Sequence, residues 1–188
     1  MNHIHPTAII TEHVVLGDNI TIGAYSVIGG DPQHLAFKGE PGKVYIDDNV
    51  VIRELVTIHS AMEQQGTVIQ SGCLIMALTH IGHDSIIGKN VVISTGTTIA
   101  GHSIIGDNSY LGINSSVHQW SHFPALSILG AGSFFKGTAP IGVKLAGTPA
   151  RILCMNLQAI QEHLDPGRAE NMINHLKSLD IRLPREPQ

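Results

Sequence analysis

An aliphatic residue recurs at every sixth position through most of this 188-residue chain. One register runs over residues 4–58 and is broken only at His34 and Glu40. A second register, set off by an eleven-residue step, runs over residues 69–129. Eighteen of the nineteen repeated positions are Ile, Leu or Val, and the other is Phe123. Because a short fixed period is the signature of stacked repeats, it constrains the fold more than any single motif does.

The six-residue unit contains the elements of a short strand and a bend. The inward aliphatic residue is often followed by Gly and then by Asp-Asn or Lys-Asn, as in Leu16-Gly17-Asp18-Asn19, and these are turn-forming residues. Three units complete a coil of 18 residues, and coils stacked at the spacing of hydrogen-bonded strands form a parallel β-helix. The sequence therefore predicts an all-β solenoid of about six coils.

Two stretches leave the period. Residues 29–43 are rich in Gly and Pro and are expected to loop outward from the solenoid, where loops commonly carry substrate contacts. After residue 149, Leu153, Leu157, Ile160 and Leu164 follow helical spacing, and a second amphipathic segment follows Asp165-Pro166-Gly167. We expect a β-helix domain over residues 1–149 and a short helical extension over residues 150–188.

Composition excludes several classes of function. Eleven Lys and Arg against fifteen Asp and Glu offer no basic surface for nucleic acid, and no apolar run is long enough to span a bilayer. The two cysteines, Cys73 and Cys154, form neither a CxxC motif nor a disulfide framework. The sequence is typical of a cytoplasmic protein with no transmembrane segment.

The period also indicates where chemistry can concentrate. Residues 18 apart should lie one above another, so that His83 stacks over Gly101 and Asp84 stacks over His102. The candidate residues gathered in this way from three successive coils are His83, Asp84, Gly101, His102 and Gln119, with His80 and His118 nearby.

These residue types suit acyl transfer. An imidazole can take a proton from a hydroxyl or amine near neutral pH, and a neighbouring carboxylate can orient it. Gly101 could present a bare backbone N–H to an oxyanion. Neither cysteine falls in the patch, so we expect direct attack on the acyl donor without a covalent enzyme intermediate.

The period resembles that of the hexapeptide-repeat acyltransferases, whose β-helix is left-handed. Four segments resemble, more specifically, the acyl carrier protein-dependent UDP-N-acetylglucosamine O-acyltransferase family, which opens lipid A synthesis. They are Ile52-Arg53-Glu54-Leu55-Val56-Thr57-Ile58-His59, His80-Ile81-Gly82-His83-Asp84, Ala100-Gly101-His102 and Ser116-Val117-His118-Gln119-Trp120. The similarity extends over about residues 4–160.

The resemblance implies roles for the candidate residues. His83 would be the general base, Asp84 its orienting partner and Gly101 the oxyanion donor. The cleft for the substrates would be lined by Gln33, His80, His102, His118 and Gln119. It implies an acyl thioester of acyl carrier protein as donor, a nucleotide sugar as acceptor, a homotrimer with its site between subunits, and neither a metal nor a resident cofactor.

Several features leave alternatives open. His34 and Ala36 stand where the family carries an acidic residue and a lysine that touch the nucleotide sugar. The segment Gly147-Thr148-Pro149-Ala150-Arg151 resembles the ending of acetyl-CoA-dependent members of the superfamily, so CoA thioesters and small sugar-like acceptors, with O- or N-acylation, stay possible. Two further alternatives are a zinc hydratase of the carbonic anhydrase kind on the same prism, and a catalytically silent scaffold.

Overall fold

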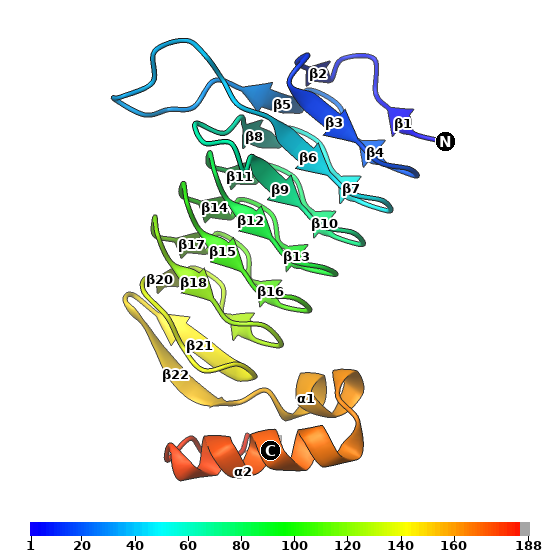
Figure 1. Cartoon of the computed structure of the whole chain (residues 1–188). Helices are drawn as coiled ribbons and strands as arrows, with labels where there is room; N and C mark the ends of the chain where they lie inside the picture. Colours follow the sequence, from blue (N-terminus) through cyan, green and yellow to red (C-terminus); the bar gives the residue numbers. More distant parts are fainter. Residues whose placement is uncertain (185–188) are drawn as a thin grey trace.

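The computed structural model describes residues 1–184 and shows a three-sided prism whose faces are parallel β-sheets (Figure 1). Sheet A contains β1 (His3–Ile4), β4 (Thr21–Ile22), β7 (Val51–Ile52), β10 (Leu74–Ile75), β13 (Val92–Ile93), β16 (Tyr110–Leu111), β19 (Ile128–Leu129), β21 (Val143–Gly147) and β22 (Ala150–Met155). Sheet B contains β2 (Ile9–Ile10), β5 (Val27–Gly30), β8 (Thr57–His59), β11 (His80–Ile81), β14 (Thr98–Ile99), β17 (Ser116–Val117) and β20 (Phe134–Phe135). Sheet C contains β3 (Val14–Leu16), β6 (Val44–Ile46), β9 (Thr67–Ile69), β12 (Ile86–Ile87), β15 (Ile104–Ile105) and β18 (His122–Phe123).

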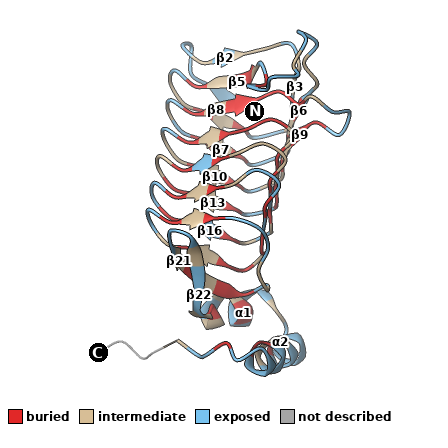
Figure 2. Cartoon of the chain, turned by 90° about the vertical axis from the view of Figure 1, so that its left-hand side faces the viewer, coloured by how far each residue is buried: buried red, intermediate tan, exposed pale blue. Residues whose placement is uncertain are grey.

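The core is the column of aliphatic side chains that the six-residue period predicts. Sixteen of the nineteen repeated positions are buried, and the three exceptions, Ile4, Ile10 and Leu16, belong to the first coil, which has a neighbouring coil on one side only. Figure 2 shows buried segments recurring from one coil to the next below the first coil. Burial of one aliphatic side chain is worth about 1.5–3 kcal/mol, so the repeat itself supplies most of the driving force for folding.

Two excursions interrupt the coils, and both leave at the edge where sheet B passes to sheet C, hereafter the B–C edge. The first spans residues 31–43, between β5 and β6, and the second spans residues 60–66, between β8 and β9 (Figure 1). The expected loop began at residue 29, but Gly29 and Gly30 belong to β5, because their carbonyl groups accept hydrogen bonds from the side chain and amide of Ser60.

The C-terminal segment corrects one expectation. Residues 150–155 are not helical but form β22, which pairs antiparallel with β21 after the turn at residues 148–149. The hairpin holds Leu153 in a strand, and helical structure begins only with α1 (Leu157–His163). The second helix, α2 (Pro166–Ser178), starts at the Asp165-Pro166 signal, where the Asp165 side chain accepts a hydrogen bond from the Arg168 amide.

Both helices pack below the last coil (Figure 1). Within residues 1–184, neither is long and apolar enough to cross a lipid bilayer. Part of the segment expected as the helical extension, residues 185–188, lies outside the described residues.

Candidate active site

The B–C edge of three consecutive coils carries the candidate residues. His83 and Asp84 follow β11, Gly101 and His102 follow β14, and each coil lies 18 residues below the previous one, because His80 pairs with Thr98. The amide of His102 donates to the carbonyl of His83 at 2.9 Å. The stacking expected from the period is therefore confirmed at this edge.

His83 and Asp84 form a close pair. Nδ1 of His83 lies 2.8 Å from Oδ2 of Asp84, and only 9% and 5% of the two side chains are exposed. Because a carboxylate can only accept, Nδ1 carries the proton and Nε2 keeps its lone pair. This is the tautomer that a general base acting through Nε2 requires.

The second excursion holds the carboxylate of Asp84. The backbone amides of Met62 and Glu63 donate to it at 2.9–3.1 Å, and the amide of Asp84 itself donates to Oγ1 of Thr67 at 2.8 Å. Burial opposes ionisation of Asp84, but the hydrogen bonds from His83, Glu63 and Met62 outweigh it and hold the pKa of the carboxyl below its usual value. Sequence reasoning missed these donors, because they are backbone groups outside the repeat.

Gly101 leaves space for the His83 ring. A Cβ on Gly101 would lie 2.7 Å from Nε2 of His83, closer than real Cβ atoms come to any neighbour. Within residues 1–184 the amide of Gly101 has no hydrogen-bond acceptor. An unpaired N–H therefore lies beside the nitrogen that would take the proton, which is the arrangement an oxyanion donor needs.

His80 belongs to the same cluster of imidazoles. Its Nδ1 shares a hydrogen bond of 2.8 Å with Oγ1 of Thr57, and its ring lies edge-on to that of His59, with centroids 4.7 Å apart. Burial, followed by the charge of His83, lowers the pKa of His80. Burial, followed by the charges of His80 and His83, lowers the pKa of His59 to about 4. Sequence reasoning did not place His59 beside His80, because β11 pairs with β8 across 23 residues rather than 18.

The first excursion brings His34 to the site. Its ring lies edge-on to that of His83, with centroids 5.4 Å apart. Nδ1 of His34 accepts a hydrogen bond of 3.1 Å from the amide of Ala36, so Nε2 carries the proton and is the donor. The backbone amide of Ala36 thus restrains the ring that lies edge-on to His83.

The remaining predicted residues lie around this cluster without contacting its centre. Gln33 is exposed in the first excursion, and Gln119 is exposed one coil below Gly101. His118 donates from Nδ1 to the carbonyl of Gln119 at 2.9 Å and packs edge-on against Phe134. No hydrogen bond among residues 1–184 joins these three side chains to His83. Their roles in substrate binding stay predictions.

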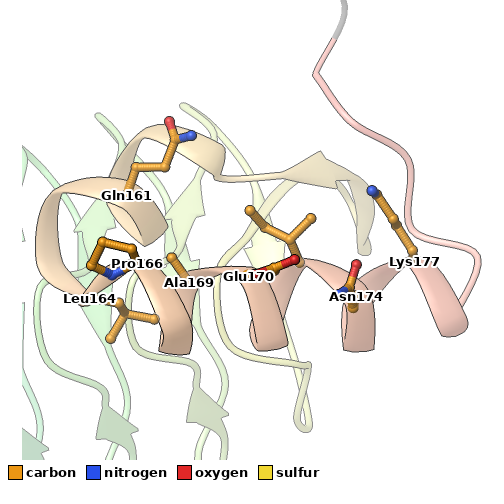
Figure 3. A pocket seen from close by; sticks show the side chains of 8 residues that line it. Gln161, Leu164, Pro166, Ala169, Glu170, Asn174 and Lys177 are labelled. Atoms are coloured by element: carbon orange, nitrogen blue, oxygen red, sulfur yellow. The ribbon is translucent and has the colours of Figure 1, made fainter.

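A hollow of about 150 Å³ opens on the sheet C side of the edge, lined in part by Asp84, His102 and Trp120. The His102 ring stacks face to face on the Trp120 indole, with centroids 3.8 Å apart and an interplanar angle of 4°. A larger hollow of about 510 Å³ lies beside α2 and α1, lined by residues such as Leu164, Glu170 and Lys177 (Figure 3). It lies beyond the last coil, away from the imidazoles.

One group of residues has the spacing of a metal site. Ligand atoms of His83, Asp84 and His102 all lie within 4.8 Å of one another. However, the Asp84 oxygens already accept hydrogen bonds from His83, Met62 and Glu63. A metal would have to displace these donors, so the geometry favours a histidine-carboxylate pair over metal coordination.

Comparison with known proteins identifies the family. Residues 66–101 match the bacterial transferase hexapeptide (six repeats). A structure of a UDP-N-acetylglucosamine acyltransferase from Bacteroides fragilis 9343 superposes with a TM-score of 0.85 and 27% identity over 99% of this chain and 79% of that chain. The fold is thus the left-handed parallel β-helix.

Acyl-acyl-carrier-protein–UDP-N-acetylglucosamine O-acyltransferases from Pseudomonas putida strain F1 and Pseudomonas savastanoi pv. phaseolicola are 36% and 32% identical, over 94% of this chain and 82% of each relative. Identity at this level over most of both lengths means that the chain belongs to the acyl carrier protein-dependent UDP-N-acetylglucosamine O-acyltransferase family.

Proposed function

We propose that the protein transfers an acyl group from the thioester of acyl carrier protein to a hydroxyl of UDP-N-acetylglucosamine. Family membership supports the two substrates, since the relatives are named for them. The observation that carries the chemistry is the pair formed by His83 and Asp84, with a bond of 2.8 Å on Nδ1 and with Nε2 lying against Gly101.

The reaction needs one base and one oxyanion donor. Nε2 of His83 takes the proton of the acceptor hydroxyl as its oxygen attacks the thioester carbonyl carbon, and Asp84 stabilises the resulting imidazolium. The N–H of Gly101 donates to the oxyanion of the tetrahedral intermediate. The carbon–sulfur bond then breaks, and the imidazolium returns the proton to the leaving thiolate. No enzyme nucleophile takes part, because both thiols are elsewhere and burial raises the pKa of Cys73 to about 11.

The test is a steady-state assay with acyl carrier protein thioesters of several chain lengths and UDP-N-acetylglucosamine, following release of the thiol and the mass of the acylated sugar. His83→Gln should lower kcat/KM at least about a thousandfold. His175→Gln, which changes an exposed imidazole on α2, is the matched control and should be silent. Retention of more than about a tenth of the activity by His83→Gln would refute the role of the base.

The donor and the acceptor are tested in the same assay. Acetyl-CoA in place of the acyl carrier protein thioester should react much more slowly, and a faster reaction would assign the protein to the acetyl-CoA-dependent class. We propose that the acceptor contacts His34, whose ring lies edge-on to that of His83 and whose Nε2 carries the proton. We therefore expect His34→Ala to raise KM for the nucleotide sugar more than it lowers kcat.

We also propose that the active form is a trimer. Leu55 and Leu78 lie in adjacent coils at the edge between sheets A and B, are 48% and 58% exposed, and both have a left-handed backbone with φ near 60°. Bulky apolar residues are unfavourable in that conformation and in water, so a second subunit that covers them would offset the cost. Sedimentation should give three times the chain mass of 20.1 kDa. Leu78→Asp should yield an inactive monomer, and an active monomer would refute the proposal.

A further inference from the structure

Trp120 occupies a backbone position that an indole rarely takes. Its φ is 60°, in the left-handed region, and 63% of the residue is exposed. At the equivalent turn on the edge between sheets C and A, four of the six positions hold the residue type that best tolerates this conformation, Asn19, Asn49, Asn90 and Asn108, and the other two are Gly72 and Leu126. A bulky aromatic residue that is held in an unfavourable conformation and left in water points to a function rather than to packing.

The contact that Trp120 makes is with His102. The two rings are nearly parallel, at 4°, and their centroids lie 3.8 Å apart, which leaves only 15% of the His102 side chain exposed. At the edge of the His102 ring, Nε2 lies 3.9 Å from Oδ2 of Asp84. This distance is too long for a hydrogen bond, so a hydrogen bond to Asp84 does not fix the ring orientation. Two aromatic contacts restrict it instead: the His102 ring lies edge-on to that of His83, with centroids 5.0 Å apart, and the stacked indole covers one of its faces.

We propose that Trp120 is a positioning residue that fixes the His102 imidazole beside the pair of His83 and Asp84. The inference rests on the proposed function, because it assigns His102 a role in the acyl-transfer site. With Nε2 directed at Asp84, the other ring nitrogen is the one left for a substrate. Without the indole, the ring would rotate about its side-chain bonds, and this contact would be made in only a fraction of the molecules.

The first test is a double-mutant cycle in kcat/KM. Trp120→Leu should reduce kcat/KM about threefold to tenfold. This is the change in rate that corresponds to losing the interaction energy of one stacked aromatic pair. Trp120→Phe keeps a flat ring and should restore most of the loss. In a His102→Ala background, Trp120→Leu should change kcat/KM by less than about twofold, since a residue that acts through His102 has nothing left to orient.

Leucine is a suitable replacement because this chain already places leucine in the same conformation, at Leu55, Leu78 and Leu126, with φ of 57–62°. The substitution therefore adds no new backbone strain. Tyr110→Leu is the matched control, because Tyr110 is an exposed aromatic residue of β16 on sheet A and should leave kcat/KM unchanged. The thermal unfolding midpoint of each variant, compared with that of the wild type, distinguishes a loss of positioning from a loss of folding. If Trp120→Leu does not fold, Trp120→Phe still tests the proposal.

The second test needs no activity. Trp120 is the only tryptophan of the chain, so emission excited at 295 nm reports this residue alone. His102→Ala should shift the emission to the red and increase quenching by acrylamide, because one face of the indole becomes open to water. His118→Ala, on the same coil, should change neither property.

The outcomes distinguish the two proposals. Unchanged emission in His102→Ala, equal losses in Trp120→Leu and Trp120→Phe, or additive losses in the double variant would overturn the positioning role. An inactive wild-type protein would instead overturn the proposed function, while the emission would still show whether the stack exists.

Discussion

Replacing Gly101 by alanine perturbs the site at one atom. The new Cβ would lie 2.7 Å from Nε2 of His83 and 2.8 Å from Cε1, whereas ordinary van der Waals contacts begin at 3.4 Å. Gly101 does not have a positive φ, so alanine adds no backbone strain there. The cost therefore falls on the position of the imidazole.

The imidazole must retreat by about 0.7 Å to restore an ordinary contact. That displacement is large compared with the tolerance of its 2.8 Å hydrogen bond to Asp84, so either the bond lengthens or the ring turns. Misplacement of a catalytic group by about 1 Å can cost a hundredfold in rate. We therefore expect Gly101→Ala to lower kcat/KM by about 30-fold to 100-fold, chiefly through kcat, with little change in thermal midpoint.

The assay is the acyl-transfer reaction at saturating donor, accompanied by a melting curve. Gly30→Ala is the control, because a Cβ there would meet its nearest neighbours, including Cδ2 of His59, at 3.7 Å, an ordinary contact. It should retain wild-type kcat. If Gly101→Ala retains more than about half of the wild-type kcat, His83 does not act from the position that the structure gives it.

Four further predictions concern titratable groups. In steady-state kinetics, Asp84→Asn should lower kcat about a thousandfold or more, because an amide no longer selects the tautomer of His83. The pKa of Asp84 is lowered in the folded state, so its ionised carboxylate adds to the free energy of unfolding. This contribution should be lost as pH falls below about 4, and in urea titrations Asp84→Asn should not show that pH dependence. Because the pKa of His59 is about 4 when folded and 6.5 when unfolded, the unfolded state binds more protons between these values. Unfolding free energy should therefore fall by up to about 3 kcal/mol as pH drops from 6.5 to 4, and His59→Gln should flatten this dependence in urea titrations. Substituting both Cys73 and Cys154 by serine should leave kcat within about twofold, and a large loss would contradict direct transfer without a thiol intermediate.

The repeat predicted the prism and the centre of the site for the same physical reason. A fixed period of six places inward side chains in columns and also places residues 18 apart in contact, so His83 over Gly101 and Asp84 over His102 follow from counting. Such arithmetic is reliable where the period is unbroken. The same count places His102 over Trp120, but it does not give the orientation of the two rings, and their parallel stacking became visible only in three dimensions.

The rest of the site could not be predicted, because it comes from breaks in the period. The step from β8 to β11 is 23 residues, which places Thr57 against His80 and brings His59 beside it. The hairpin of β21 and β22 was missed for a different reason: the apolar spacing around Leu153 is also compatible with a helix, and β22 follows β21 in an antiparallel pair that the six-residue period does not describe.

The second excursion allows the importance of these breaks to be tested. Deleting residues 61–65 would reduce the step from β8 to β11 from 23 residues to the regular 18, so the coil should still close and the aliphatic column should remain intact. The deletion removes Met62 and Glu63, whose amides donate two of the hydrogen bonds that keep the pKa of Asp84 low. That pKa should rise, and the acid limb of the kcat/KM profile should move to higher pH while circular dichroism stays that of the prism. If the deleted protein folds and its pH profile is unchanged, the excursion does not control the charge of Asp84, and the repeat alone builds the active pair.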